Sequence, residues 1–172
     1  MLRPAQPGWT RWLALAGAVI VADLATKAWI TSAFRHGEVR EMTPFFNLVL
    51  AHNTGAAFSF LAGAGGWQRW FFAIIAVAIS AGIVVILRGH AGKRLFALAL
   101  ALVLGGALGN LYDRVSLGYV VDFVQLHAAG YYWPAFNVAD SAICVGVALL
   151  LWDGLKSGAA VPSSTVVRQE KP

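Results

Sequence analysis

The sequence predicts an all-α membrane protein with four transmembrane helices and a small extracytoplasmic β-hairpin or sheet after the first helix. Two observations support this prediction. The chain is 59% hydrophobic and only 12% charged, whereas about 25% of the residues in a soluble domain are charged. Its apolar residues also gather in runs close to the roughly 20 residues that a helix needs to cross a bilayer. We therefore expect one integral membrane domain over residues 1–172.

The first helix is expected over residues 12–34. Arg3 and Arg11 precede its apolar run, a pattern that also begins secretory signal peptides. Because hydrophobicity resumes after Asp23 and Lys27, and further apolar runs follow, we interpret this stretch as a membrane crossing. Asp23 and Lys27 are four residues apart and share a helix face. Either they form an ion pair that spares the membrane two isolated charges, or Asp23 also supports polar groups of a neighbouring helix.

Residues 35–66 are of mixed composition and predict an extracytoplasmic β segment on the membrane surface. Residues 45–50 form a short β-prone stretch, and the chain is expected to return as a second strand after a turn at Asn53 and Gly55. Asn53, Gly55 and Phe58 combine an amide, a flexible turn and an aromatic ring, which could together grip an extended peptide. Their spacing alone favours ordinary hairpin turn chemistry.

Three further helices are predicted from apolar runs over residues 68–88, 95–114 and 134–154. The first two of these contain long stretches without a charged residue. The run over 95–114 also carries closely spaced glycines, which allow a neighbouring backbone to approach. These glycines are Gly105, Gly106 and Gly109.

The basic residues predict the orientation of the helices. They are concentrated near the N-terminus, in the 88–94 connector and after the fourth helix, so the positive-inside rule places both termini in the cytoplasm. The polar tail over 157–172 is expected to be a flexible cytoplasmic segment. The net charge of +5 does not indicate a nucleic-acid partner, because the basic residues are not interleaved with aromatic ones.

Polar residues at the outer ends of the third and fourth helices carry the functional prediction. Three of them, spaced i, i+3 and i+4, share one face of the third helix, and two that are three residues apart share one face of the fourth: Asn110, Asp113, Arg114, Asn137 and Asp140. Asp122 lies between the helices in an apolar setting. Because this connection is short and both of its ends return to one interface, Asp122 and Asp140 are expected to face each other.

Two close carboxylates suit acid–base catalysis, because they share one proton and titrate together. One can activate water while the other protonates the developing product, as in aspartic proteases. Asn110 and Asn137 can orient the pair without adding charge, and Asp113 and Arg114 can form a compensated strut. Purely structural polar contacts are the alternative. They explain the acids poorly, since an interhelical hydrogen bond contributes about 0.6 kcal/mol and a central carboxylate costs roughly 2.5 to 3.5 kcal/mol.

The sequence gives less support to other kinds of function. The four histidines have no metal-ligand spacing and no H-E-x-x-H motif occurs, so we expect neither a metal nor a cofactor. Cys144 is the single cysteine, which excludes a disulfide framework. A proton-coupled transporter using the aspartates as a relay remains an alternative, but the acids gather at one edge of the membrane and do not form a path across it. A structural assembly factor is the third alternative.

Four motifs, taken in order, closely resemble those of the bacterial lipoprotein signal peptidases, the signal peptidase II family. They are Asp23 with Lys27, N-T-G-A-A-F at 53–58, G-N-L-Y-D-R at 109–114 followed by V-D-F at 121–123, and F-N-V-A-D at 136–140. The resemblance covers about residues 10–155. It implies an aspartyl endopeptidase of the bacterial inner membrane, with both termini in the cytoplasm and its active site toward the outer face.

The resemblance also implies the substrate and the role of each matching residue. The substrate is a diacylglyceryl prolipoprotein, cut just before its lipidated cysteine, and the partners are membrane lipids and the inhibitory cyclic peptide antibiotic globomycin. Asp122 and Asp140 are the implied catalytic pair. The other implied residues are substrate-binding or supporting (Asn53, Gly55, Asn110, Arg114 and Asn137) or structural (Asp23, Lys27 and Asp113). His127 and the aromatic run Tyr131-Tyr132-Trp133 form either a flexible lid or an interfacial aromatic belt, and we favour the belt for the aromatics.

Overall fold

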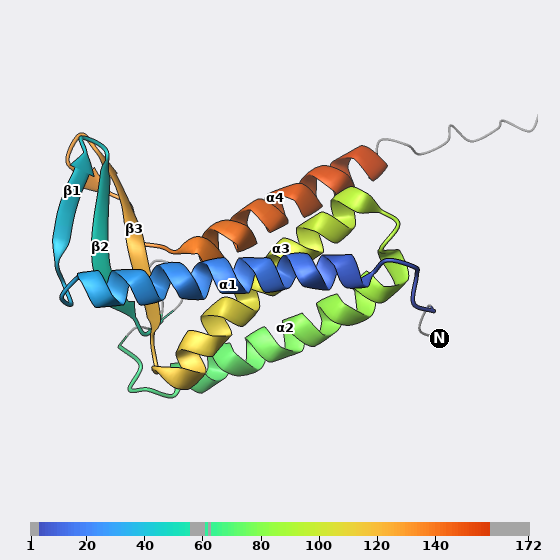
Figure 1. The fold of residues 1–172 in the computed structure, drawn as a ribbon, viewed down its shortest axis with the longest axis horizontal. Helices are drawn as coiled ribbons and strands as arrows, with labels where there is room; N and C mark the ends of the chain where they lie inside the picture. Colours follow the sequence, from blue (N-terminus) through green and yellow to red (C-terminus); the bar gives the residue numbers. More distant parts are fainter. Residues whose placement is uncertain (1–3, 56–60, 62, 159–172) are drawn as a thin grey trace, which may run out of the picture.

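In the computed structural model, four long helices run beside one another and a small β-sheet stands across one end of them (Figure 1). The structure describes residues 4–55, 61 and 63–158, and these contain α1 (Thr10–Ala33), α2 (Gln68–His90), α3 (Arg94–Ser116) and α4 (Val138–Gly158). Each helix is long and apolar enough to cross a membrane. The predicted class, a four-helix membrane protein with a small sheet, is confirmed.

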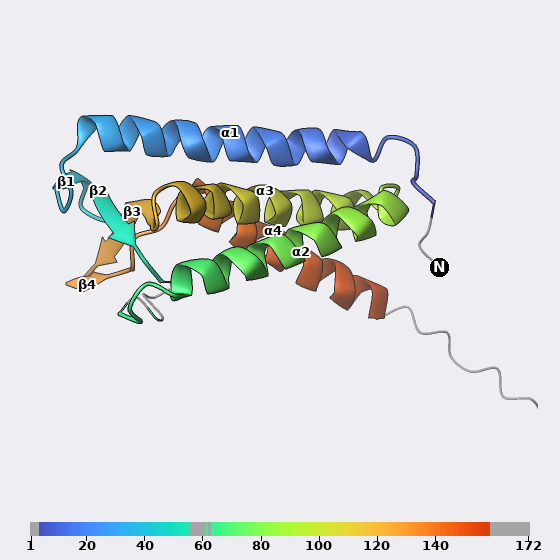
Figure 2. The same ribbon diagram turned by 90° about the horizontal axis from the view of Figure 1, so that it is seen from below.

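Helix α3 is the centre of the bundle and contacts each of the other three helices (Figure 2). Its glycines permit this close packing. A Cβ atom built on Gly105 would lie 2.8 Å from the carbonyl oxygen of Ala16 in α1, and one on Gly106 would overlap the carbonyl oxygen of Ala139 in α4. The α3 glycines therefore admit neighbouring helices of the same chain.

We predict that Gly106→Ala lowers the free energy of unfolding by about 1–3 kcal/mol, the usual cost of overpacking. The added methyl group meets backbone of α4, which cannot move aside without displacing that helix. Gly82→Ala is the matched control, since a Cβ at Gly82 in α2 meets nothing within 4 Å and alanine favours helix formation. Thermal unfolding in detergent measures both variants. Equal melting temperatures would contradict the packing role of Gly106.

The sheet is built from two separate parts of the chain, β1 (Val39–Thr43) with β2 (Phe46–Asn53) and β3 (Val120–Ala128) with β4 (Tyr131–Tyr132). The strand order is β1-β2-β3-β4 and every pairing is antiparallel. The predicted β segment over residues 35–66 therefore supplies only two of the four strands. The other two come from the connection between α3 and α4, where β3 pairs with the edge of β2 that β1 leaves open.

The hairpin within the described residues lies earlier in the chain than the predicted one. The hairpin turns between Thr43 and Phe46, so the stretch expected as its first strand is its returning strand. That strand runs on to Asn53. There the backbone N–H of Gly55 donates a hydrogen bond to Asn53 Oδ1 at 2.9 Å, which is local turn chemistry, and the strand expected to follow this turn runs into residues 56–60, outside the described residues. Phe58 lies outside the described residues.

Helix α4 begins at Val138, four residues after the predicted start at 134. The preceding residues are extended because Phe136 bonds to β3 instead. Its carbonyl oxygen accepts the N–H groups of Phe123 and Val124, and its own N–H donates to the carbonyl oxygen of Val124 at 3.0 Å. This bridge holds the entrance of α4 against the strand that carries Asp122.

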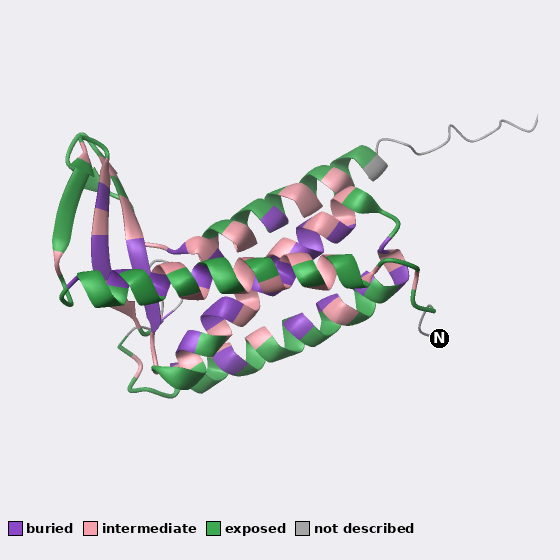
Figure 3. Ribbon diagram, in the orientation of Figure 1, coloured by how far each residue is buried: buried purple, intermediate pink, exposed green. Residues whose placement is uncertain are grey.

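The buried residues lie where the helices contact one another and where the sheet meets the helix bundle (Figure 3). One buried apolar cluster joins the end of α1 to β2 and β3 through Ile30, Phe34, Leu50, Val121 and Phe123. The outward surfaces of the helices instead expose large apolar side chains such as Ile74 and Leu151, as expected where lipid replaces water. Tyr131, Tyr132 and Trp133 are exposed too, and the interfacial belt stays a prediction.

Candidate functional site

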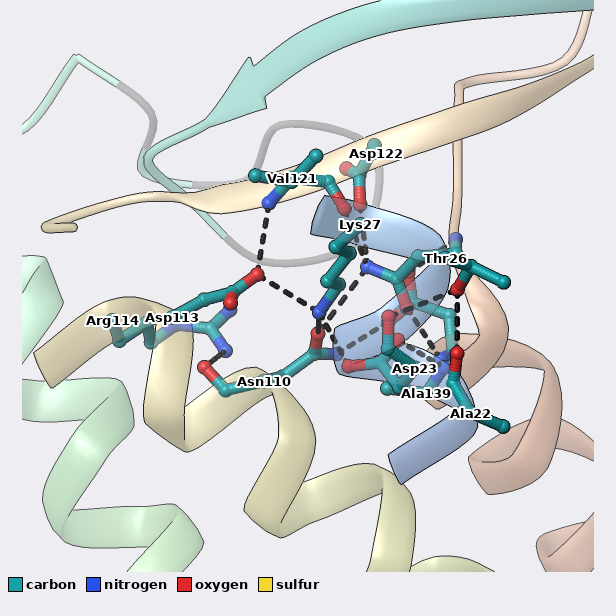
Figure 4. A network of polar contacts seen from close by, with 12 residues as sticks. Ala22, Asp23, Thr26, Lys27, Asn110, Asp113, Arg114, Val121, Asp122 and Ala139 are labelled. Carbon is teal, nitrogen blue, oxygen red and sulfur yellow. Dashed lines mark hydrogen bonds and ion pairs between the residues drawn. The ribbon is translucent and has the colours of Figure 1, made fainter. Parts of the chain in front are cut away.

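A buried cation joins α1 to α3 at the centre of the polar cluster (Figure 4). Lys27 Nζ lies 2.7 Å from Asp23 Oδ2 and 2.8 Å from Asp113 Oδ2, and it donates a hydrogen bond of 3.0 Å to Asn110 Oδ1. These four side chains are buried. Both interpretations of Asp23 and Lys27 hold, because the ion pair forms and Asp23 also accepts a hydrogen bond from α4.

Asp122 enters the cluster from β3, whose pairing with β2 brings it close to Asn53. Ala51 is the register partner of Asp122, and Asn53 Nδ2 donates to Asp122 Oδ2 at 3.1 Å. The other carboxylate oxygen accepts a hydrogen bond of 2.7 Å from Asn137 Nδ2. Asp122 is only 3% exposed. Its carboxyl group is therefore held by two neutral amides and is almost removed from solvent.

Asp140 is held by the first turn of α4. Asn137 and Asp140 form a reciprocal capping box, in which Asn137 Oδ1 accepts the N–H of Asp140 at 2.9 Å and Asp140 Oδ2 accepts the N–H of Asn137 at 3.2 Å. The second oxygen of Asp140 accepts a hydrogen bond of 2.8 Å from Asn110 Nδ2. Asn137 therefore bonds to both Asp122 and Asp140, and the structure brings the two predicted acids to one asparagine.

The electrostatics of the pair bring the titration of Asp122 close to neutral pH. Burial raises the pKa of Asp122 to about 7, and the nearby charge of Asp140 acts in the same direction. The hydrogen bonds from Asn53 and Asn137 favour the ionised form and partly offset this shift. Two carboxyl groups in this arrangement can share one proton.

Arg114 does not form the predicted strut with Asp113. Within the described residues, Asp113 pairs with Lys27, while Arg114 donates to the carbonyl oxygen of Gly55 at 3.0 Å and to that of Asn110 at 3.3 Å. The guanidinium also lies over the ring of Phe72, 5.3 Å from its centroid. Arg114 thus ties α3 to the end of β2.

An apolar groove of about 620 Å³ opens between α2, α3 and α4, and Asp140 is one of its lining residues whereas Asp122 is not. Its polar lining includes Asn110, Arg114 and Asp140, and most of its other lining residues are apolar or aromatic. Phe72 and Phe136 line it without having been predicted as functional. Periodicity could have placed Phe72 on a helix face, but nothing in the sequence says that this face borders a groove. The described residues hold no cluster of three or more His, Cys, Asp or Glu side chains suited to a metal ion.

Fold and site together define a class of protein. It is an integral membrane protein with two acidic side chains hydrogen-bonded to one asparagine, one of which lines an apolar groove between the helices. Comparison with known proteins narrows this class. The sequence model described as signal peptidase (SPase) II matches residues 15–156. The chain belongs to the signal peptidase II family, whose members are proteases that cleave signal peptides from lipoproteins.

Individual relatives agree with this assignment. The chain is 57% identical over 145 residues to a lipoprotein signal peptidase of Ralstonia nicotianae, covering 84% of each chain. It is 52% identical over 145 residues to one from a Janthinobacterium species, covering 84% of this chain and 88% of the relative. A solved bacterial membrane enzyme matches with a TM-score of 0.80 and 32% identity, over 96% of this chain and 99% of that one. The protein is thus a multi-pass bacterial membrane protein.

Proposed function

We propose that the protein is an aspartic endopeptidase that removes the signal peptide from diacylglyceryl-modified prolipoproteins, cutting just before the lipidated cysteine. The observation that carries this proposal is that Asp122 and Asp140 both bond to Asn137 and that Asp140 lines an apolar groove. Membership of the signal peptidase II family supplies the substrate class.

The chemistry follows from the shared proton. The ionised carboxylate takes a proton from a water molecule while the oxygen of that water bonds to the scissile carbonyl carbon. The protonated carboxyl group donates a hydrogen bond to the developing oxyanion. When the carbon–nitrogen bond breaks, a carboxyl group returns a proton to the leaving amine. Asn53, Asn110 and Asn137 are the supporting groups, because each donates an amide hydrogen bond to one of the two acids. No metal or cofactor takes part in this scheme.

The groove suits a substrate that is already in the membrane. A signal peptide is an apolar helix, and the groove between α2, α3 and α4 offers it apolar walls beside the acids. The diacylglyceryl chains can remain among the membrane lipids. Arg114 and Gly55 contribute as supporting residues at the mouth, where the guanidinium holds the end of β2 beside the acids.

The orientation of the chain follows from its basic residues. Figure 1 shows that the sheet stands at one end of the bundle, while the start of α1 and the end of α4 lie at the other. Basic residues gather at that other end, where Arg88 and Lys93 flank the connector between α2 and α3. By the positive-inside rule, both termini are in the cytoplasm and the sheet and the acids lie at the outer face of the bacterial inner membrane.

The test is cleavage of a synthetic diacylglyceryl precursor by the purified protein in lipid nanodiscs, with the products identified by mass spectrometry. We expect one cut before the lipidated cysteine, inhibition by globomycin, and no inhibition by metal chelators or serine-directed reagents. A precursor without the lipid is the matched control. Proton flux in liposomes without any cleavage would instead support a transporter.

We predict that kcat/KM falls as the pH rises through about 7. Because burial raises the pKa of Asp122 to this value, its carboxyl group is protonated below it and ionised above it. Two adjacent carboxylates then lack the shared proton. Asn53→Ala removes a hydrogen bond that favours the ionised form, so this variant is expected to retain activity to higher pH.

The control for this prediction is Asn47→Ala. Asn47 also lies on β2, but its side chain bonds to Gln125 and His127 and not to the acids, so its pH profile should match that of the wild type. An alkaline limb that stays in place in Asn53→Ala, or that moves to lower pH, would contradict the assignment.

A further inference from the structure

Lys27 lies between the carboxylates of Asp23 and Asp113. Each of these carboxylates accepts a backbone hydrogen bond from the residue immediately before one of the paired acids. Asp23 Oδ1 accepts the backbone N–H of Ala139 at 2.9 Å, and Ala139 precedes Asp140. Asp113 Oδ2 accepts the backbone N–H of Val121 at 3.1 Å, and Val121 precedes Asp122. The other contact of each carboxylate is to the ammonium group of Lys27 (Figure 4). One cation thereby joins the backbone of β3 to that of α4.

The third contact of Lys27 helps to determine how Asn110 is turned. The amide oxygen of Asn110 accepts a hydrogen bond from Lys27 Nζ at 3.0 Å and one from Asn137 Nδ2 at 3.2 Å, and its amide nitrogen donates to Asp140 Oδ1 at 2.8 Å. An ammonium group can only donate, so it attracts the oxygen of the amide and leaves the NH₂ for the other side. Lys27 and Asn137 together therefore select the orientation that supports Asp140.

We propose that Lys27 is a positioning residue that sets the separation and orientation of Asp122 and Asp140, acting through Asp23, Asp113 and Asn110. This inference rests on the proposed function and goes beyond an ion pair that neutralises charge in the membrane. Neutralising Asp23 needs only a partner four residues along the same helix. The three contacts of Lys27 join α1 to α3. Through Asp23 and Asp113 they also connect to the backbone N–H groups that immediately precede Asp140 and Asp122.

The type of cation matters to this arrangement. A lysine ammonium is a compact charge with three donors, which matches three acceptors around one point: Asp23, Asp113 and Asn110. An arginine keeps the charge but spreads its donors over a planar fork. It would meet the same three oxygens at different positions and shift β3 relative to α4.

The decisive variant is the neutral triple Asp23→Asn, Lys27→Met, Asp113→Asn. Its two asparagine oxygens can still accept the N–H groups of Ala139 and Val121, and no unpaired charge is buried. We expect this triple to melt near the wild-type temperature but to lose about a hundredfold in kcat, with KM changed less than threefold, as for a lost catalytic alignment.

Lys27→Arg provides a second, charge-conserving test should the triple not fold. We expect it to fold and to lose at least tenfold in kcat with KM nearly unchanged. Thr26→Val is the matched control on the same helix, because the Thr26 hydroxyl donates only to carbonyl oxygens of its own helix; its kcat should equal that of the wild type.

Wild-type kcat in a folded triple variant, or in Lys27→Arg, would overturn the positioning role and leave only a structural ion pair. Failure of the proposed function is recognised separately, because the wild-type protein itself would then leave the diacylglyceryl precursor uncut.

Discussion

Replacing either Asp122 or Asp140 by asparagine is expected to lower kcat for precursor cleavage by at least about a thousandfold, within the range that general acid–base groups contribute. Asparagine has nearly the same volume and can accept one of the existing hydrogen bonds, but it can neither take a proton from water nor share one with its partner. Cleavage of the diacylglyceryl precursor in nanodiscs, with kcat and KM measured separately, checks both variants.

The stability of these variants distinguishes catalysis from a structural role. Ionised Asp122 is buried, so at pH 8 we expect Asp122→Asn to melt at or above the wild-type temperature. Asp153→Asn is the matched control, since Asp153 lies on α4 near its opposite end, and it should cleave at the normal rate. Near-normal turnover by either active-site variant would show that the pair is assigned wrongly.

Asn137→Ala is expected to have the second largest effect, a loss of about a hundredfold or more in kcat. Asn137 donates to Asp122, caps α4, and accepts the N–H of Asp140, so its removal releases both acids at once. Loss of the cap should also lower the free energy of unfolding by about 1 kcal/mol. Kinetics and thermal unfolding of the same preparation measure the two effects.

Two further variants separate the roles of Asn137. Asn137→Asp keeps an oxygen that can cap the helix but loses the NH₂ group that donates to Asn110, Val121 and Asp122. We therefore expect strongly reduced activity and a melting temperature below that of the wild type. Ser141→Ala removes only a hydroxyl that donates to the carbonyl oxygen of Asn137 and should be nearly silent. If Asn137→Ala were destabilised yet fully active, the Asn137 side chain would serve only as a helix cap.

The arrangement of the site explains why a sheet accompanies the four helices. Asp140 lies in the first turn of a helix, where the capping box with Asn137 holds one of its oxygens and Asn110 of α3 holds the other. Asp122 lies in the connection between two helices, where a loop would leave its position poorly defined. Pairing with β2 gives that connection a fixed register and delivers Asn53 to its carboxylate.

Local sequence patterns were enough to predict the helices and the polar faces. Each apolar run predicts its own helix because its residues must bond internally wherever lipid surrounds them. The spacing of Asn110, Asp113 and Arg114 likewise predicts a shared face. Residue type alone also marks Asp122 and Asp140 as unusual, because a carboxylate near the membrane needs a reason to be there. The predicted start of α4 is four residues too early because residues 134–136 continue the apolar pattern, whereas Phe136 bonds to β3.

The remaining features depend on contacts between distant parts of the chain. The sequence by itself determined four membrane-spanning helices, an acidic pair and its neutral amides. Only the tertiary structure decided that β3 pairs with β2, that Asp113 bonds to Lys27 and not to Arg114, and that the α3 glycines receive helices of the same chain. The physical reason is that helix hydrogen bonds close within four residues, whereas strand register and buried ion pairs are chosen among partners that folding brings together.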